Sequence, residues 1–113
     1  MKIGSLLFTL AVSSLAHTGL AVAADDGTAA VEALGRLNGI ALACQQPALV
    51  SRARNAVVTT APKTRGYGEA FEAATNAAYL EHGKGVACPD AATLASQMAT
   101  AEKRLQASFA TIK

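Results

Sequence analysis

The two cysteines of the chain, Cys44 and Cys88, place the strongest constraint on what it can fold into. An even number of cysteines in an exported protein predicts a disulfide, because thiols are oxidised outside the cytoplasm. Closing a loop of roughly 45 residues destabilises the unfolded chain by about 4 kcal/mol. That is comparable with the whole stability of a small domain. We therefore predict one bridge between Cys44 and Cys88 that the fold requires.

The amino-terminal segment has the pattern of an export signal. Lys2 precedes an apolar run over residues 3–15, and residues 21–23 read Ala-Val-Ala, the small-x-small pattern that a signal peptidase accepts. Cleavage after Ala23 or Ala24 would leave a mature chain that begins near Asp25. We predict that residues 1–24 are a signal peptide and that residues 25–113 form a single helical domain.

The same segment is poorly suited to anchor the protein in a membrane. A spanning helix needs about 20 predominantly apolar residues, and here Ser13, Ser14, His17, Thr18 and Gly19 interrupt the apolar run. No cysteine stands at the predicted cleavage point, so a lipoprotein site is missing as well. We expect a periplasmic protein without a stable membrane anchor in its mature form.

The charge of the chain gives little support for a nucleic-acid partner. Ten Lys and Arg residues face eight Asp and Glu residues, for a net charge of +2, and Lys2 lies in the predicted leader. The mature part is thus close to neutral, and it has no basic or acidic tail. Binding to nucleic acid is not predicted.

The composition and the spacing of apolar residues predict an all-α fold. Alanine, the best helix former, is abundant, while the alternating β-branched and aromatic runs of a sandwich do not occur. We predict about four short helices over residues 28–45, 47–61, 69–82 and 90–112, with an irregular connection over 62–68. Their inward-facing residues repeat at steps of three and four. These are Ala30, Leu34, Leu37, Ala41 and Cys44; Leu49, Val50, Ala53, Val57 and Ala61; Phe71, Ala74, Ala78 and Leu80; and Leu94, Met98, Ala101, Leu105, Phe109 and Ile112.

Several residues inside or beside these helices have alternative interpretations. Gly35 and Gly39 lie one turn apart in the first helix, and since glycine weakens a helix we expect a neighbouring backbone to pack against them. Pro47 either ends the first helix or opens the second. Asn38 and Asn76 could each bridge helices, line a pocket or simply be exposed.

No catalytic or metal-binding constellation is visible. His82 is the only histidine after the leader, and it could be a ligand, a proton switch or a general base. It falls in the last turn of a predicted helix, where histidine commonly satisfies terminal carbonyls, and we favour that role. Glu69 and Glu72 fall in a first turn, where they complement the helix dipole. A zinc site needs four nitrogen or sulfur ligands, and CxxC and CxxCH motifs are lacking. We predict no enzyme activity, no metal site and no cofactor.

The best candidate for a partner-binding surface is a group of basic residues and one tyrosine around the second connection. Arginine binds carboxylates through its planar fork, and tyrosine gives rigid contact area. The alternative is a solvated basic face. The residues of this predicted Arg/Tyr surface are Arg52, Arg54, Lys63, Arg65 and Tyr67.

In its size, export signal, helical content and single disulfide, the chain broadly resembles periplasmic acid-stress chaperones and small periplasmic immunity proteins that neutralise antibacterial toxins. No motif specific to either group is present, so no functional residue is carried over. We expect a non-catalytic protein-binding module of the periplasm. The alternatives are a stress chaperone and a carrier of a small ligand or metal.

Overall fold

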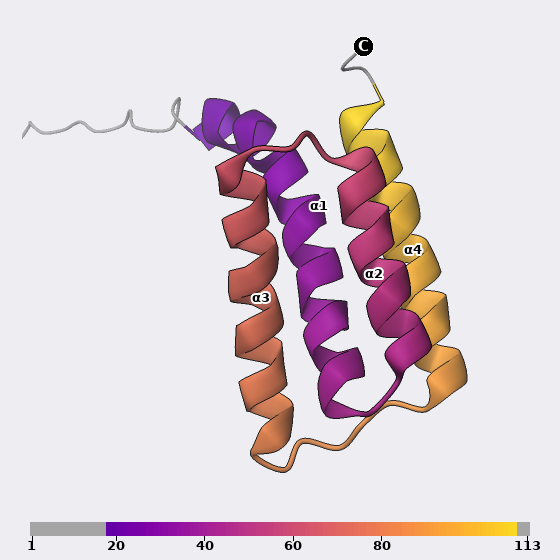
Figure 1. Cartoon of the computed structure of the whole chain (residues 1–113). Coiled ribbons are helices and arrows are strands. Elements are labelled where there is room, and N and C mark those ends of the chain that lie inside the picture. The colour runs from indigo at the N-terminus through magenta and orange to yellow at the C-terminus, as the bar shows by residue number, and fades with distance from the viewer. Residues whose placement is uncertain (1–17, 111–113) are drawn as a thin grey trace, which may run out of the picture.

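The computed structural model describes residues 18–110, with side chains from residue 26 onward, and consists of four α-helices (Figure 1). They are α1 (Thr18–Ala43), α2 (Pro47–Thr60), α3 (Arg65–Gly83) and α4 (Ala91–Phe109). No strand occurs in the described range. The predicted all-α class and the number of helices are confirmed. Most of the predicted leader, residues 1–17, lies outside the described part of the chain.

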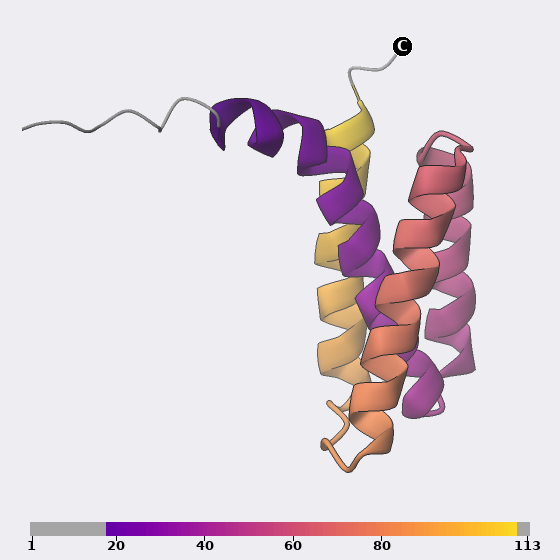
Figure 2. The same ribbon diagram turned by 90° about the vertical axis from the view of Figure 1, so that its left-hand side faces the viewer.

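Helix α1 begins ten residues earlier than the sequence predicted, at Thr18 instead of Thr28. Its first turns project sideways from the bundle (Figure 2). The predicted cleavage point after Ala23 or Ala24 falls within these turns. At Gly27 the helix packs closely against the rings of Phe109 and Tyr67. A Cβ added at this position would lie 2.9 Å from Cζ of Phe109 and 3.0 Å from Oη of Tyr67. The helix continues through Gly27 because the missing side chain leaves room for these rings.

Helix α1 ends at Ala43, two residues before the predicted end. Gln45 adopts the left-handed conformation, with φ of 59°, and the Gln46 amide donates to the Ala41 carbonyl at 2.8 Å. This is the hydrogen-bond pattern that closes many helices. Pro47 is then the first residue of α2, where its missing N–H costs nothing.

The core is built around α1, which packs against each of the other three helices, while α2 also packs against α4. The residues predicted to face inward on α1, α2 and α4 are all buried or half-buried within the described part of the chain. Ile112, the last of the α4 set, lies outside that part. The buried apolar residues are Ala30, Val31, Leu34, Leu37, Ile40, Ala41, Leu49, Ala53, Ala61, Phe71, Ala78, Leu94, Met98, Ala101, Leu105 and Phe109.

Two glycines let α3 lie directly on α1, as predicted. A Cβ added at Gly35 would stand 2.7 Å from the carbonyl oxygen of Phe71 and 2.9 Å from Cβ of Ala74. One added at Gly39 would collide with the carbonyl oxygen of Thr75. Both obstacles include backbone atoms of α3, so only glycine permits this separation of the two helices.

A polar contact crosses the same interface. Nδ2 of Asn38 donates to Oγ1 of Thr75 at 3.2 Å, and the Thr75 hydroxyl donates to the Gly35 carbonyl at 3.1 Å. Both side chains are buried. Oδ1 of Asn38 has no hydrogen-bond partner among the described residues. Asn38 therefore bridges two helices, whereas Asn76 is exposed.

Helix α3 corrects three predictions. It begins at Arg65 because Thr64 caps it, the Thr64 hydroxyl accepting from the Tyr67 amide at 3.3 Å, so the irregular connection is shorter than predicted. Glu69 and Glu72 consequently lie beyond the first turn. Leu80 is 53% exposed and not inward-facing. The buried positions of α3 are Phe71, Thr75 and Ala78, and a residue two positions after Ala78 faces away from that stripe.

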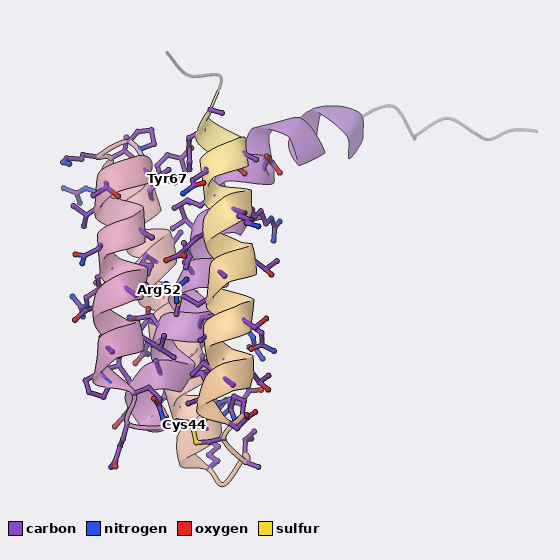
Figure 3. The ribbon with its side chains drawn as sticks, turned by 90° about the vertical axis from the view of Figure 1, so that its right-hand side faces the viewer. Cys44, Arg52 and Tyr67 are labelled. Atoms are coloured by element: carbon purple, nitrogen blue, oxygen red, sulfur yellow. A yellow bond between two sulfur atoms is a disulfide. The ribbon has the colours of Figure 1, made fainter. Side chains whose placement is uncertain are left out.

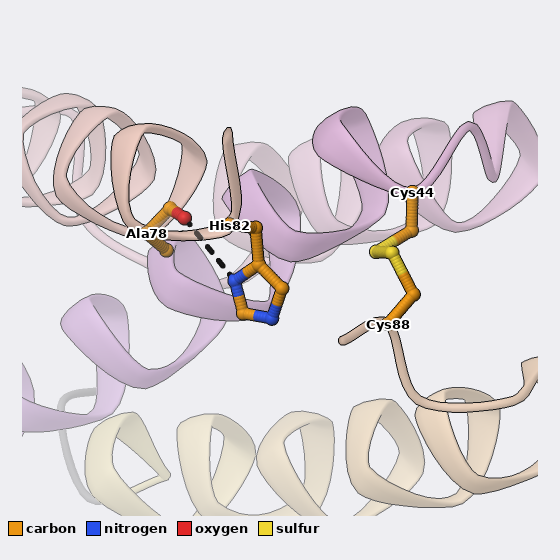
Figure 4. Close-up of a disulfide and its surroundings, with 4 residues drawn as sticks. All are labelled: Cys44, Ala78, His82 and Cys88. Atoms are coloured by element: carbon orange, nitrogen blue, oxygen red, sulfur yellow. Dashed lines mark hydrogen bonds between the residues drawn. A yellow bond between two sulfur atoms is a disulfide. The ribbon is translucent and has the colours of Figure 1, made fainter. Parts of the chain in front are cut away.

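Helix α4 begins at Ala91, with Asp90 at the N-cap, so Pro89 precedes the helix and does not sit in its first turn. The predicted disulfide is present: Cys44 directly follows α1, Cys88 lies just before α4, and their Cα atoms are 5.8 Å apart (Figure 4). The bridge fixes the α3–α4 connection to the end of α1.

Candidate binding slot between helices α3 and α4

Helices α3 and α4 lie on opposite sides of α1 and flank it (Figure 1). Their backbones make no close contact with each other within residues 18–110, and the side view shows them separated (Figure 2). At one end the rings of Tyr67 and Phe109 stack edge to face, with centroids 5.2 Å apart. At the other end the connection 84–90 joins the helices. Between these two ties the surface of α1 is accessible.

This accessible region contains a hollow of about 630 Å³, which we call the α3–α4 slot. Its floor comes from α1, one wall from α4, and its lower end from the end of α3 and the connection. The lining residues are Ala33, Arg36, Leu37, Ile40, His82, Val86, Pro89, Ser96, Gln97, Thr100, Ala101 and Arg104.

The lining combines an apolar floor with polar and cationic groups. Leu37, Ile40 and Ala101 are mostly buried in the core and present only their outer atoms, while Val86 at the end of the slot is exposed. Two guanidinium groups, Arg36 and Arg104, belong to the lining. No Asp or Glu is among these described lining residues.

A second hollow of about 760 Å³ adjoins the slot between α1 and α3, and Arg36 lines both. Its α3 side is formed mainly by small side chains, among them Ala70, Ala73 and Ala77. Arg36 reaches across to Glu81, with an N–O distance of 3.5 Å. Both side chains are more than half exposed, so this ion pair contributes little to stability.

His82 extends from α3 toward α4 (Figure 4). Its Nδ1 lies 3.3 Å from the carbonyl oxygen of Ala78, one turn earlier in α3, so this contact does not involve the terminal carbonyls that the sequence suggested. A carbonyl can only accept, so Nδ1 donates its proton in this contact.

The lower end of the slot depends on the disulfide. Val86, Ala87 and Cys88 are exposed, and within the described chain the backbone amides of residues 86–88 donate no hydrogen bond to another backbone group. The bridge to Cys44 is the covalent tie that holds this stretch against the bundle. It thereby fixes where Val86 and Pro89 close the slot.

Two members of the predicted Arg/Tyr surface, Arg52 and Tyr67, lie apart and contact other parts of the bundle. Arg52 lies midway along the bundle and Tyr67 near one end (Figure 3). Tyr67 belongs to the first turn of α3 and is half-buried against Phe109. Arg54, Lys63 and Arg65 are exposed, and Nζ of Lys63 lies 3.3 Å from the Val58 carbonyl.

Arg52 is engaged within the bundle. Its Nε and a terminal nitrogen donate to the two carboxylate oxygens of Glu102 on α4, at 2.9 and 2.8 Å. The hydrogen bond to Glu102 raises the pKa of Arg52 above its ordinary value. This bidentate pair borders a hollow between α2 and α4 that is otherwise lined largely by hydroxyl and amide side chains. The charge of Arg52 is therefore already neutralised, unlike that of a free recognition group.

Of the slot residues, the sequence pointed to His82 and to the inward-facing Leu37 and Ala101, but not to the polar side chains of α4. Gln97, Thr100 and Arg104 are spaced at three and four residues on α4, but polar residues at that spacing are typical of any solvated helix face. What distinguishes them is that α3 fails to cover α1 beside them, which depends on tertiary packing.

No family model matches this chain. Searches of curated proteins and of solved structures also found no similar protein. Within residues 18–110, no helix is long and apolar enough to cross a bilayer, and no group of three His, Cys, Asp or Glu side chains is placed to hold a metal ion.

Proposed function

We propose that this protein is a non-catalytic binding factor of the periplasm, exported with loss of residues 1–24, and that it receives a segment of a partner protein in the α3–α4 slot. The observation that carries the proposal is the separation of α3 from α4. Here one side of α1 is left accessible between two walls.

The chemistry of the slot favours binding over catalysis. Its hydroxyls, on Ser96 and Thr100, have no hydrogen bond to His82, whose one side-chain hydrogen bond goes to a backbone carbonyl. A nucleophile needs an adjacent base, and the base needs an orienting group. Instead, the slot has an apolar floor bordered by polar side chains, which is the arrangement typical of protein–protein interfaces.

The shape favours a protein segment over a small molecule. Small-ligand sites usually enclose most of the ligand's surface. The slot is bounded by α1, α4 and the connection and adjoins the second hollow along α3. An elongated occupant would use both.

Site-specific photocross-linking in the periplasm tests this function. We would place a benzophenone amino acid at Thr100 in the slot, at Arg65 on the predicted Arg/Tyr surface, and at Asn55 on α2 as a control. All three residues are exposed, so the fold should tolerate each change. Thermal unfolding of each variant checks this.

The proposal predicts a cross-linked partner protein from position 100 and none from position 55. A cross-link from position 65 alone would show that the partner binds at the Arg/Tyr surface and would contradict binding in the slot. The absence of any protein cross-link from position 100, in a variant that melts like the wild type, would refute the proposed function.

A further inference from the structure

We infer that the segment which occupies the α3–α4 slot is an acidic amphipathic α-helix of the partner. This inference rests on the proposed function and adds the chemistry of the occupant. It draws on three features of the slot: its length, the size of the side chains beside it, and the sign of its charges.

The length of the slot matches a short helical contact. On α1 the lining runs from Ala33 to Ile40, and on α4 from Ser96 to Arg104. These stretches span seven and eight residue steps, or roughly 10–12 Å at the rise of an α-helix. A partner helix lying along α1 would therefore make its main contacts over about two turns. Two turns are enough for apolar side chains at positions i, i+3, i+4 and i+7 of the partner helix to contact the slot.

The second hollow allows the occupant to approach closely on its α3 side. Ala70, Ala73 and Ala77 present only methyl groups there, and the larger Leu80, Glu81 and Lys84 lie at one end. Small residues at a contact shorten the distance between two helix axes. A helix is thus a better match to this side than an extended strand, which would leave its backbone hydrogen-bonding groups unpaired against alanine.

The charges of the slot select an acidic occupant. Arg104 forms no ion pair with any residue in the described range, and Arg36 has only the exposed contact with Glu81. No carboxylate is among the described residues that line the slot, whereas Glu32, Glu81 and Lys84 line the adjoining second hollow, so the acidic residues of the occupant are expected at the slot itself. A partner with Glu or Asp beside its apolar stripe would pair with Arg36 and Arg104, whereas Lys or Arg there would be repelled.

Direct binding of designed peptides to the oxidised, mature protein tests this inference. Three fluorescein-labelled peptides of about 20 residues, long enough to form helix in water, would be compared by fluorescence anisotropy. The first carries a leucine stripe flanked by Glu, the second has Lys in place of each Glu, and the third has the composition of the first in scrambled order.

We expect the Glu peptide to bind roughly tenfold more tightly than the Lys peptide and the scrambled peptide. Arg104→Gln should weaken binding of the Glu peptide several-fold, and Arg104→Glu should reverse the preference toward the Lys peptide. Lys103→Gln and Lys103→Glu are matched controls, because Lys103 is exposed on the same helix but does not line the slot. They should leave the preference unchanged.

Equal binding of the Glu and Lys peptides would overturn the inference, as would equal effects of the changes at positions 103 and 104. If no peptide binds although position 100 cross-links to a partner, the helical occupant is wrong and the proposed function stands. If position 100 cross-links only to a second copy of this chain, the slot is a dimer contact and both proposals fail.

Discussion

Substitution of Gly39 by alanine tests how closely α3 is held to α1. The new Cβ would collide with the carbonyl oxygen of Thr75 and lie 2.9 Å from both Cβ of Ala78 and the amide nitrogen of Tyr79. Two of these three atoms belong to the backbone. A rotamer change cannot relieve the clash, so the α3 backbone has to move away from α1.

The expected cost follows from two opposing terms. Overpacking a well-packed interface costs typically about 1–3 kcal/mol. Replacing glycine by alanine inside a helix stabilises the helix by about 1 kcal/mol. The net loss should be about 1 kcal/mol, which lowers the melting temperature of a domain this small by about 4–8 °C.

Gly68→Ala is the matched control. Gly68 also lies in a helix, α3, but an added Cβ there would meet no atom within 4 Å. Only the helix-propensity gain remains, so this variant should be more stable than the wild type by up to about 1 kcal/mol. Thermal and urea unfolding followed by circular dichroism, with the disulfide intact, measures both. If Gly39→Ala is as stable as Gly68→Ala, the close contact of α1 with α3 is wrong.

Three further changes probe the other ties in the bundle. Replacing both disulfide cysteines by serine should lower the free energy of unfolding by about 2–4 kcal/mol, measured in urea under oxidising conditions; an unchanged midpoint would show that the bridge is dispensable. A double-mutant cycle with Arg52→Ala and Glu102→Ala should give a coupling energy of about 0.5–1 kcal/mol, because the pair is bidentate yet partly exposed; additive effects would mean that the pair contributes nothing. Thr75→Val removes the hydroxyl that bonds Asn38 and should cost about 1–3 kcal/mol, while Thr75→Ser, which keeps the hydroxyl, should cost less; the reverse order in thermal melts would argue against the buried hydrogen bonds.

The parts of the fold that the sequence predicted are those governed by local pattern. The stripe Leu94, Met98, Ala101 and Leu105 repeats every three or four residues, and such a stripe specifies both a helix and its buried face. Gly35 and Gly39 predicted close packing for a similar reason, since two glycines on one helix face weaken the helix unless a neighbour uses the space.

The errors arose where a local signal had two meanings. The connection predicted over residues 62–68 contains Gly66 and Gly68, but the threonine cap at position 64 starts a helix that continues through both glycines. In α3 the polar Thr75 occupies a buried position between Phe71 and Ala78, so the buried face of the helix is not continuous in apolar residues. For this reason Leu80 was wrongly predicted to face inward.

The candidate site could not be predicted because it depends on which helices are neighbours. The sequence shows that Thr100 and Arg104 lie on one face of a helix. It does not show that α3 leaves α1 uncovered beside that face. The Arg/Tyr surface was predicted from proximity along the chain, which could not show that Arg52 pairs with Glu102 and that Tyr67 stacks on Phe109.

The most direct test of the slot is the affinity of the cross-linked partner for two variants that each carry one added tryptophan. Thr100→Trp fills the slot, and Asn55→Trp places the same bulk on the hollow between α2 and α4. Calorimetry with purified partner should show that Thr100→Trp weakens binding at least roughly tenfold while Asn55→Trp binds like the wild type. Equal affinities for the two variants, both folded, would contradict the account.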